Sequence, residues 1–164
     1  MNVIGESPDW GAGLFAVLLI AAALDDGLRR KISNLIILAL FAGTILVAAV
    51  LGIEASFWTN GAVFVALLLL GSLAFSAGML GGGDVKLLAT TAFWFAPADL
   101  LILLPAVAIA GGLLVLAWVP LRMIRGKTAA RTALKERSLP YGIAIALGGI
   151  VSAAIVRGIM PWTG

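Results

Sequence analysis

The sequence predicts an all-α integral membrane protein, with six transmembrane helices in a single domain over residues 1–164. Hydrophobic residues make up 62% of the chain and charged residues 12%, whereas soluble domains have about 45–50% and about 25%. The hydrophobic residues form runs close to the length of about 20 residues that crosses a bilayer, and the charged residues collect between those runs. We therefore expect a multi-pass protein of the inner (cytoplasmic) membrane, in contact with lipid.

The first predicted span covers residues 10–27, and its last turn contains Asp25 and Asp26. A secretory signal would begin with a basic segment, and none precedes this run, so we expect a retained helix. Arg29, Arg30 and Lys31 follow almost directly. The positive-inside rule makes these residues cytoplasmic and places the N-terminus outside.

The second and third predicted spans are residues 32–52 and 61–79. Trp58 lies between them at the outer interface, where tryptophan is enriched. The third span returns to the cytoplasmic side and leads to Gly81–Gly83 and Asp84. The fourth, residues 84–96, is short, because about 13 helical residues rise only about 20 Å across a core of about 30 Å. Either its helix begins within the glycines, or the membrane there is thinned and partly wet.

The last two predicted spans are residues 100–121 and 138–160. The first of them contains Gly111 and Gly112, which we expect at a point of close helix packing. The connecting residues 122–137 are rich in Lys and Arg and should be cytoplasmic. Arg157 and Trp162 then lie at the outer surface. Every Lys and Arg except Arg157 falls on the predicted cytoplasmic side, which supports the six-span topology.

The chain contains neither cysteine nor histidine. Disulfides, thiol nucleophiles, Ser-His-Asp triads and the usual His/Cys zinc sites are therefore excluded, and we expect no metal and no cofactor. The net charge of +3 is interpreted as a topological signal and not as a nucleic-acid-binding surface. Acid–base chemistry is left mainly to carboxylates.

Asp25, Asp26 and Asp84 are the acidic residues at the predicted cytoplasmic ends of the spans, and each allows a structural interpretation. Arg29 and Arg30 could neutralise the adjacent pair at helical spacing, and Asp84 could only cap a helix. Consecutive helical residues point about 100° apart, so one of the pair should face the interior. Glycines before Asp84 allow positive φ and close approach of another chain. Two carboxylates that share a proton can hydrolyse a peptide without a metal.

The residues at these sites resemble the type IV prepilin peptidases, membrane aspartyl proteases with a GxGD motif. Gly81-Gly82-Gly83-Asp84 and the following Val85-Lys86-Leu87 match that motif and its continuation. Asp26 and Asn34, eight positions apart, resemble the first family motif, and this register favours Asp26 over Asp25. Ser33 replaces the usual proline and can cap the second span instead. Leu139-Pro140-Tyr141-Gly142 resembles a third, less specific segment.

The resemblance implies an aspartic endopeptidase that removes the leader of prepilin or pseudopilin precursors at the cytoplasmic membrane face. Asp26 and Asp84 would be the catalytic pair, with Gly81 and Gly83 giving mobility and access, and Lys86 and Asn34 positioning the carboxylates. The short chain is similar to the peptidase-only form of tight-adherence (Flp-type) pilus systems, so no methyltransferase activity is expected. Archaeal preflagellin peptidases share these motifs.

Two other classes of function fit the sequence. A small proton-coupled transporter or channel could use Asp26 and Asp84 as a relay, although relays generally place carboxylates through the membrane depth. A non-catalytic scaffold subunit of a secretion machine would tolerate neutral replacements of both aspartates. Replacing each aspartate by asparagine separates these hypotheses.

Overall fold

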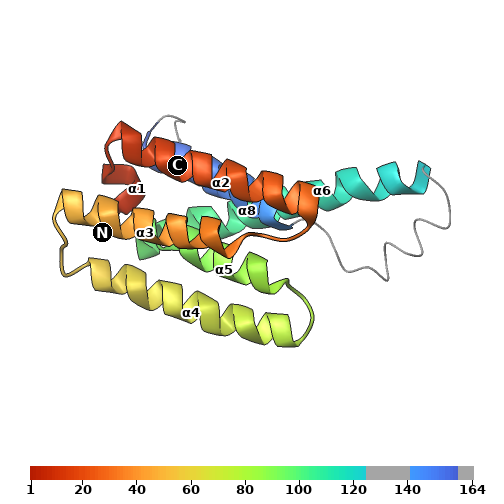
Figure 1. Cartoon of the computed structure of the whole chain (residues 1–164), viewed down its shortest axis with the longest axis horizontal. Helices are drawn as coiled ribbons and strands as arrows, with labels where there is room; N and C mark the ends of the chain where they lie inside the picture. Colours follow the sequence, from red (N-terminus) through yellow and green to blue (C-terminus); the bar gives the residue numbers. More distant parts are fainter. Residues whose placement is uncertain (125–140, 159–164) are drawn as a thin grey trace.

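The computed structural model describes residues 1–124 and 141–158, which fold as a bundle of helices (Figure 1). No strand occurs within these residues. The helices are α1 Val3–Glu6, α2 Asp9–Arg29, α3 Asn34–Leu51, α4 Phe57–Ser76, α5 Gly82–Ala92, η1 Pro97–Asp99, α6 Leu100–Ile124 and α8 Tyr141–Val156. Helices α2, α4 and α6 run in one direction, and α3, α5 and α8 run back (Figure 1). We call the end at which α3, α5 and α8 begin the basic end, because it carries Arg29–Lys31 and Lys86.

Four helical segments are long and apolar enough to cross a membrane, namely α2, α3, α4 and Pro97–Ala117 at the start of α6. Six spans were expected, and four segments among the described residues qualify by length and composition. Helix α5 has 11 residues, a rise of about 16 Å, and α8 has 16 residues, a rise of about 24 Å. Both are shorter than a hydrocarbon core of about 30 Å. The outside location of the N-terminus stays a prediction.

The connections at the basic end explain where α3 and α5 begin. Ser33 precedes α3, and its hydroxyl accepts a hydrogen bond from the Leu35 N–H at 3.2 Å, which confirms that serine caps this helix. Helix α5 begins at Gly82, so the helix does start within the glycines. Gly81–Gly83 take no positive φ, and the turn before them takes its positive φ, 70°, at Gly78.

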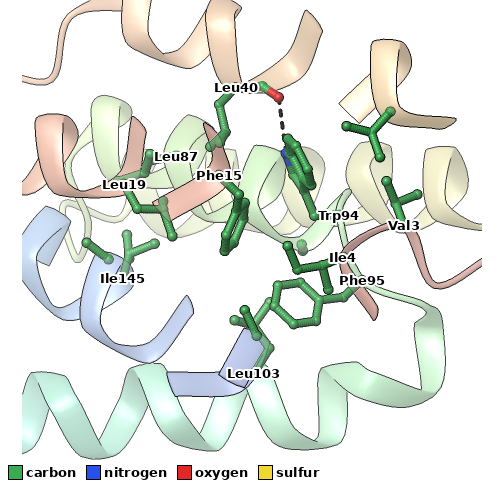
Figure 2. Packing of buried hydrophobic residues seen from close by; sticks show 14 of the residues in the cluster. Val3, Ile4, Phe15, Leu19, Leu40, Leu87, Trp94, Phe95, Leu103 and Ile145 are labelled. Atoms are coloured by element: carbon green, nitrogen blue, oxygen red, sulfur yellow. Dashed lines mark hydrogen bonds between the residues drawn. The ribbon is translucent and has the colours of Figure 1, made fainter. Parts of the chain in front are cut away.

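The core lies where α2, α3, α8 and the end of α5 meet, around Trp94 (Figure 2). Trp94 is fully buried, and its indole N–H donates to the Leu40 carbonyl at 3.1 Å. The Phe15 ring lies 5.0 Å from the Trp94 ring, between centroids. A Cβ at Gly43 would lie 3.0 Å from Trp94 Cζ2, so glycine there lets α3 approach the indole. This packing fixes the end of α5 that is farther from Asp84.

Asn60 joins α4 to the same end of α5 through buried hydrogen bonds. Its side chain is fully buried. The amide nitrogen donates to the Phe93 carbonyl at 3.2 Å and to the Phe95 carbonyl at 2.9 Å. These carbonyls lie at the C-cap of α5 and two residues beyond it. A buried carbonyl without a hydrogen-bond partner is costly. Asn60 therefore stabilises the α4–α5 pair.

Arg157, which we expected at the outer surface, lies against α1 at the end of the bundle opposite the basic end (Figure 1). Its side chain is 15% exposed and forms an ion pair with Asp9 at 2.8 Å. The guanidinium also donates to the carbonyls of Ile4 and Ser7 at 3.1 and 2.7 Å. These partners explain why one arginine departs from the charge asymmetry. Trp162 and residues 125–137 of the basic loop lie outside the described residues.

Helices α2 and α6 pack on α8, whereas α4 packs chiefly on α5. Gly111 is buried at the α6–α8 contact, but a Cβ there would lie at an ordinary contact distance of 3.7 Å from Ala144 Cβ. The close approach of these two helices is at Gly148 instead, where a Cβ would lie 2.6 Å from the Val107 backbone nitrogen. Gly112 has nothing within 4 Å of its Cβ position. Val85 fills the space beside Gly71 of α4, where an added Cβ would clash with the Val85 side chain. The bundle thus has an α2–α6–α8 group and an α4–α5 pair.

Replacing Asn60 with leucine should destabilise the protein while roughly preserving side-chain volume. The change leaves the Phe93 and Phe95 carbonyls without their donor, a loss of about 1–3 kcal/mol in the free energy of unfolding. Thermal unfolding in detergent, followed by circular dichroism, measures it. Ser72→Ala is the control on α4, because Ser72 is exposed and bonds only to Leu68 of its own helix. Equal melting temperatures for the two variants would contradict the role of Asn60.

Candidate active site

A cavity of about 320 Å³ opens at the basic end of the bundle. It lies where the end of α2, the start of α3 and the start of α5 come together. Its lining is polar, charged and glycine-rich, and consists of Asp26, Arg30, Lys31, Ile32, Asn34, Gly81, Gly82, Gly83, Asp84 and Lys86. The six residues predicted from the sequence as site residues are all in this lining.

Asp26 is the buried carboxylate of the cavity. It lies in the last turn of α2 and is 6% exposed. The Gly142 N–H, in the first turn of α8, donates a hydrogen bond to Asp26 Oδ2 at 2.8 Å. An N-terminal helix amide carries partial positive charge and favours a carboxylate beside it. The contact between α2 and α8 therefore supplies the donor that an acidic side chain needs inside an apolar bundle.

Asp25 has different partners, although it neighbours Asp26 in sequence. Its Oδ2 accepts a hydrogen bond from the Ser33 N–H at 2.9 Å, and its Oδ1 lies 3.5 Å from Arg29 Nε. These contacts tie the end of α2 to the start of α3. The structural interpretation weighed for the acidic pair thus describes Asp25, which does not line the cavity.

Asp84 lies in the first turn of α5, outside the four candidate spans. Its Oδ2 accepts a hydrogen bond from the Gly81 N–H at 3.2 Å, so this aspartate both caps its helix and lines the cavity. A Cβ at Gly81 would lie 2.6 Å from the same oxygen, which explains the glycine. Burial, and to a lesser extent the negative charge of Asp26, together raise the pKa of Asp84 to about 6.

Lys86 and Asn34 form a polar link across the cavity. Lys86 Nζ donates to Asn34 Oδ1 at 3.3 Å, which joins the first turns of α5 and α3. Close by, a Cβ at Gly83 would lie 3.4 Å from Ile32 Cβ, so the glycine lets α5 approach the α2–α3 connection. The catalytic and positioning roles of these residues stay predictions, but their side chains and backbone share one site.

Arg30, Lys31, Ile32 and Gly82 line the cavity but were not singled out as site residues from the sequence. Each lies beside or between the two acidic motifs, so proximity to those motifs was the available signal. Gly142 was missed as a partner of Asp26. Among the residues that the structure describes, no group of three or more acidic side chains could hold a metal ion.

The arrangement is chemically suited to acid–base hydrolysis. Two carboxylates from separate motifs line one cavity, and the charge of one opposes ionisation of the other. Such a pair holds a proton on one member near neutral pH while the other accepts a proton. The glycines of the lining leave room for a peptide backbone, and the cationic side chains beside them provide polar contacts.

Residues 13–116 match the type IV leader peptidase family, and this segment contains Asp26, Asp84 and the glycines before it. Comparison with curated proteins and with solved structures gives no match. The matched segment makes up more than half of the chain and includes the cavity lining. The apolar helices agree with a membrane-embedded protease that acts on prepilin-like leaders in general. The chain therefore belongs to the type IV leader peptidase family.

Proposed function

We propose that this protein is an aspartic endopeptidase that removes the leader peptide of prepilin or pseudopilin precursors at the cytoplasmic face of the inner membrane. The observation that carries the proposal is that Asp26 and Asp84 line the same cavity. Family membership supports the leader-peptidase class. We further propose peptidase activity alone, as in tight-adherence (Flp-type) pilus systems, on the resemblance of the two acidic motifs.

In the proposed mechanism, the two carboxylates divide the roles of base and acid. Asp26 accepts an amide hydrogen bond from α8, which suits an ionised carboxylate that takes a proton from water. Asp84, with its pKa raised to about 6, donates a proton to the scissile carbonyl oxygen as the water oxygen attacks the carbonyl carbon. The proton from water then passes from Asp26 to the leaving nitrogen. The C–N bond breaks, and Asp84 takes back a proton from a hydroxyl of the gem-diol as the carboxylic acid forms.

The cavity offers a plausible surface for an extended peptide. Gly82 and Gly83 carry no side chains that would hold a substrate backbone away from Asp84, and Gly81 is exposed. Lys86 and Asn34, linked at 3.3 Å, keep the start of α5 against the start of α3. The two aspartates attract a basic leader. Arg30 and Lys31, which line the same cavity, repel positively charged side chains that bind beside them.

Asp26→Asn and Asp84→Asn should each reduce leader cleavage by about 10²–10⁴-fold, the usual contribution of a general acid or base. Asparagine preserves side-chain shape but neither accepts nor donates the transferred proton. Co-expression with a prepilin precursor, or reconstitution with purified precursor, measures cleavage by gel shift. Wild-type cleavage in both variants would contradict the proposed pair.

Asp25→Asn is the matched control for these variants. The asparagine oxygen can still accept the Ser33 N–H bond, and the lost ion pair involves Arg29, whose side chain is 79% exposed. Exposed ion pairs contribute little to stability. Cleavage should therefore stay within about twofold of wild type. Loss of cleavage in Asp25→Asn together with an active Asp26→Asn would show that Asp25, and not Asp26, is the catalytic aspartate.

The pKa of Asp84 should be about 6 in the wild type and lower in Asp26→Asn. The negative charge of Asp26 opposes ionisation of Asp84, so neutralising Asp26 favours the charged form and lowers the pKa. Carbon-13 NMR of aspartate-labelled protein in detergent measures the titration, with Asp84→Asn assigning the signal. Asp25→Asn should leave this pKa unchanged. An equal pKa in wild type and Asp26→Asn would show that the two carboxylates do not interact.

A further inference from the structure

The N-terminus of α8 holds the Asp26 carboxylate. The Gly142 N–H donates to Asp26 Oδ2 at 2.8 Å, across 116 residues of sequence and in a buried position. Gly142 lies beyond the segment that matches the leader peptidase family, which ends at residue 116.

Gly142 has no space for a side chain, and the atoms that occupy this space all belong to Asp26. A Cβ at Gly142 would lie 2.7 Å from Asp26 Oδ2, 2.9 Å from its Cβ and 3.0 Å from its Cγ. The backbone of Gly142 is helical and takes no positive φ, so conformational freedom does not explain the glycine. Contacts this short require displacement of the neighbouring side chain. Any larger residue would therefore push Asp26 away from α8.

We propose that Gly142 is a positioning residue for the dyad, an inference that rests on the proposed function. By lacking a side chain, it lets the Asp26 carboxylate lie against the start of α8, where the Gly142 N–H orients it in the cavity that Asp84 also lines. This N–H is a donor only, so it holds Asp26 in the form that accepts a proton. Gly142 does not contact substrate, and it acts through Asp26.

The chain offers two matched controls. Gly111→Ala changes a buried glycine that faces the start of α8, but its Cβ would make ordinary contacts of 3.7 and 3.8 Å with Ala144 and Tyr141. Gly149→Ala introduces a clash on α8 itself, 2.8 Å from Leu19 Cδ1 and 3.0 Å from Thr91 Cγ2, away from the cavity. The first tests the effect of an added methyl group, and the second tests the effect of disturbing α8 packing.

In the cleavage assay, Gly142→Ala should lower kcat by about 10²-fold, the effect of a displacement of about 1 Å at a reacting group, with KM nearly unchanged. The pH profile of kcat should also shift, because the hydrogen bond that stabilises the charged carboxylate is lost. Gly111→Ala should match wild type. Gly149→Ala should lower the melting temperature but leave the pH profile of its remaining activity in place.

Stability provides a test that does not depend on activity. Asp26→Gly removes the three atoms that a Cβ at Gly142 would meet, so Gly142→Ala should lower the melting temperature less in the Asp26→Gly protein than in wild type. Gly149→Ala, in contrast, should lower the melting temperature equally in the wild-type and the Asp26→Gly proteins. This comparison remains informative if Gly142→Ala alone folds poorly.

Two outcomes would overturn the positioning role: Gly142→Ala with wild-type kcat and pH profile, or a stability loss that is the same with and without the Asp26 side chain. Asp26→Asn in the same assay separates this failure from failure of the proposed function. If Asp26→Asn cleaves like wild type, the dyad itself is wrong. If Asp26→Asn is inactive while Gly142→Ala is fully active, only the role of Gly142 is wrong.

Discussion

Three aspartates at one end of an apolar bundle need hydrogen-bond donors, and each receives one from the start of a different helix. Asp25 accepts from Ser33 before α3, Asp26 from Gly142 in α8, and Asp84 from Gly81 before α5. The positive ends of these helices lie at the same end of the bundle (Figure 1). The acidic cavity therefore depends on the up-and-down topology, which gathers helix N-termini where the carboxylates lie.

Local pattern was sufficient to predict much of this arrangement. Hydrophobic run length indicated where the apolar helices lie, and Ser33 was predicted as a cap because it directly precedes an apolar run. The difference between Asp25 and Asp26 follows from helical geometry, since adjacent residues cannot both face the interior. The glycines before Asp84 indicated close approach of another segment, and Ile32 packs beside Gly83. Family resemblance led to the residues that line the cavity.

Other features depend on contacts between distant segments, for which no local pattern exists. Leu139-Pro140-Tyr141-Gly142 resembled a family segment, but that resemblance did not pair Gly142 with Asp26, which lies 116 residues away in the sequence. Asn60 reads as an ordinary polar residue in a loop before a span, but it bonds to the carbonyls that end α5. The sequence predicts Arg157 as a charge near the end of the last span, but it hydrogen-bonds to the Ile4 carbonyl of α1 and forms an ion pair with Asp9. Hydropathy counted α5 as a span, although its predicted length was already too short to cross the hydrocarbon core.

Buried aromatic packing holds the C-terminal end of α5, whereas the exposed Lys86–Asn34 hydrogen bond holds its N-terminal end. Trp94 and Phe95, just beyond its C-terminal end, are fully buried, whereas Asp84 lies at the other end, beside an open cavity. Helix α5 therefore has the geometry of a lever with its pivot near Trp94 and an arm of about 16 Å. A tilt of about 10° would move Asp84 by about 3 Å over that arm, while Asp26 stays attached to α8. The separation of the two carboxylates is thus set by an angle between helices, and small rigid-body rotations suffice to change it.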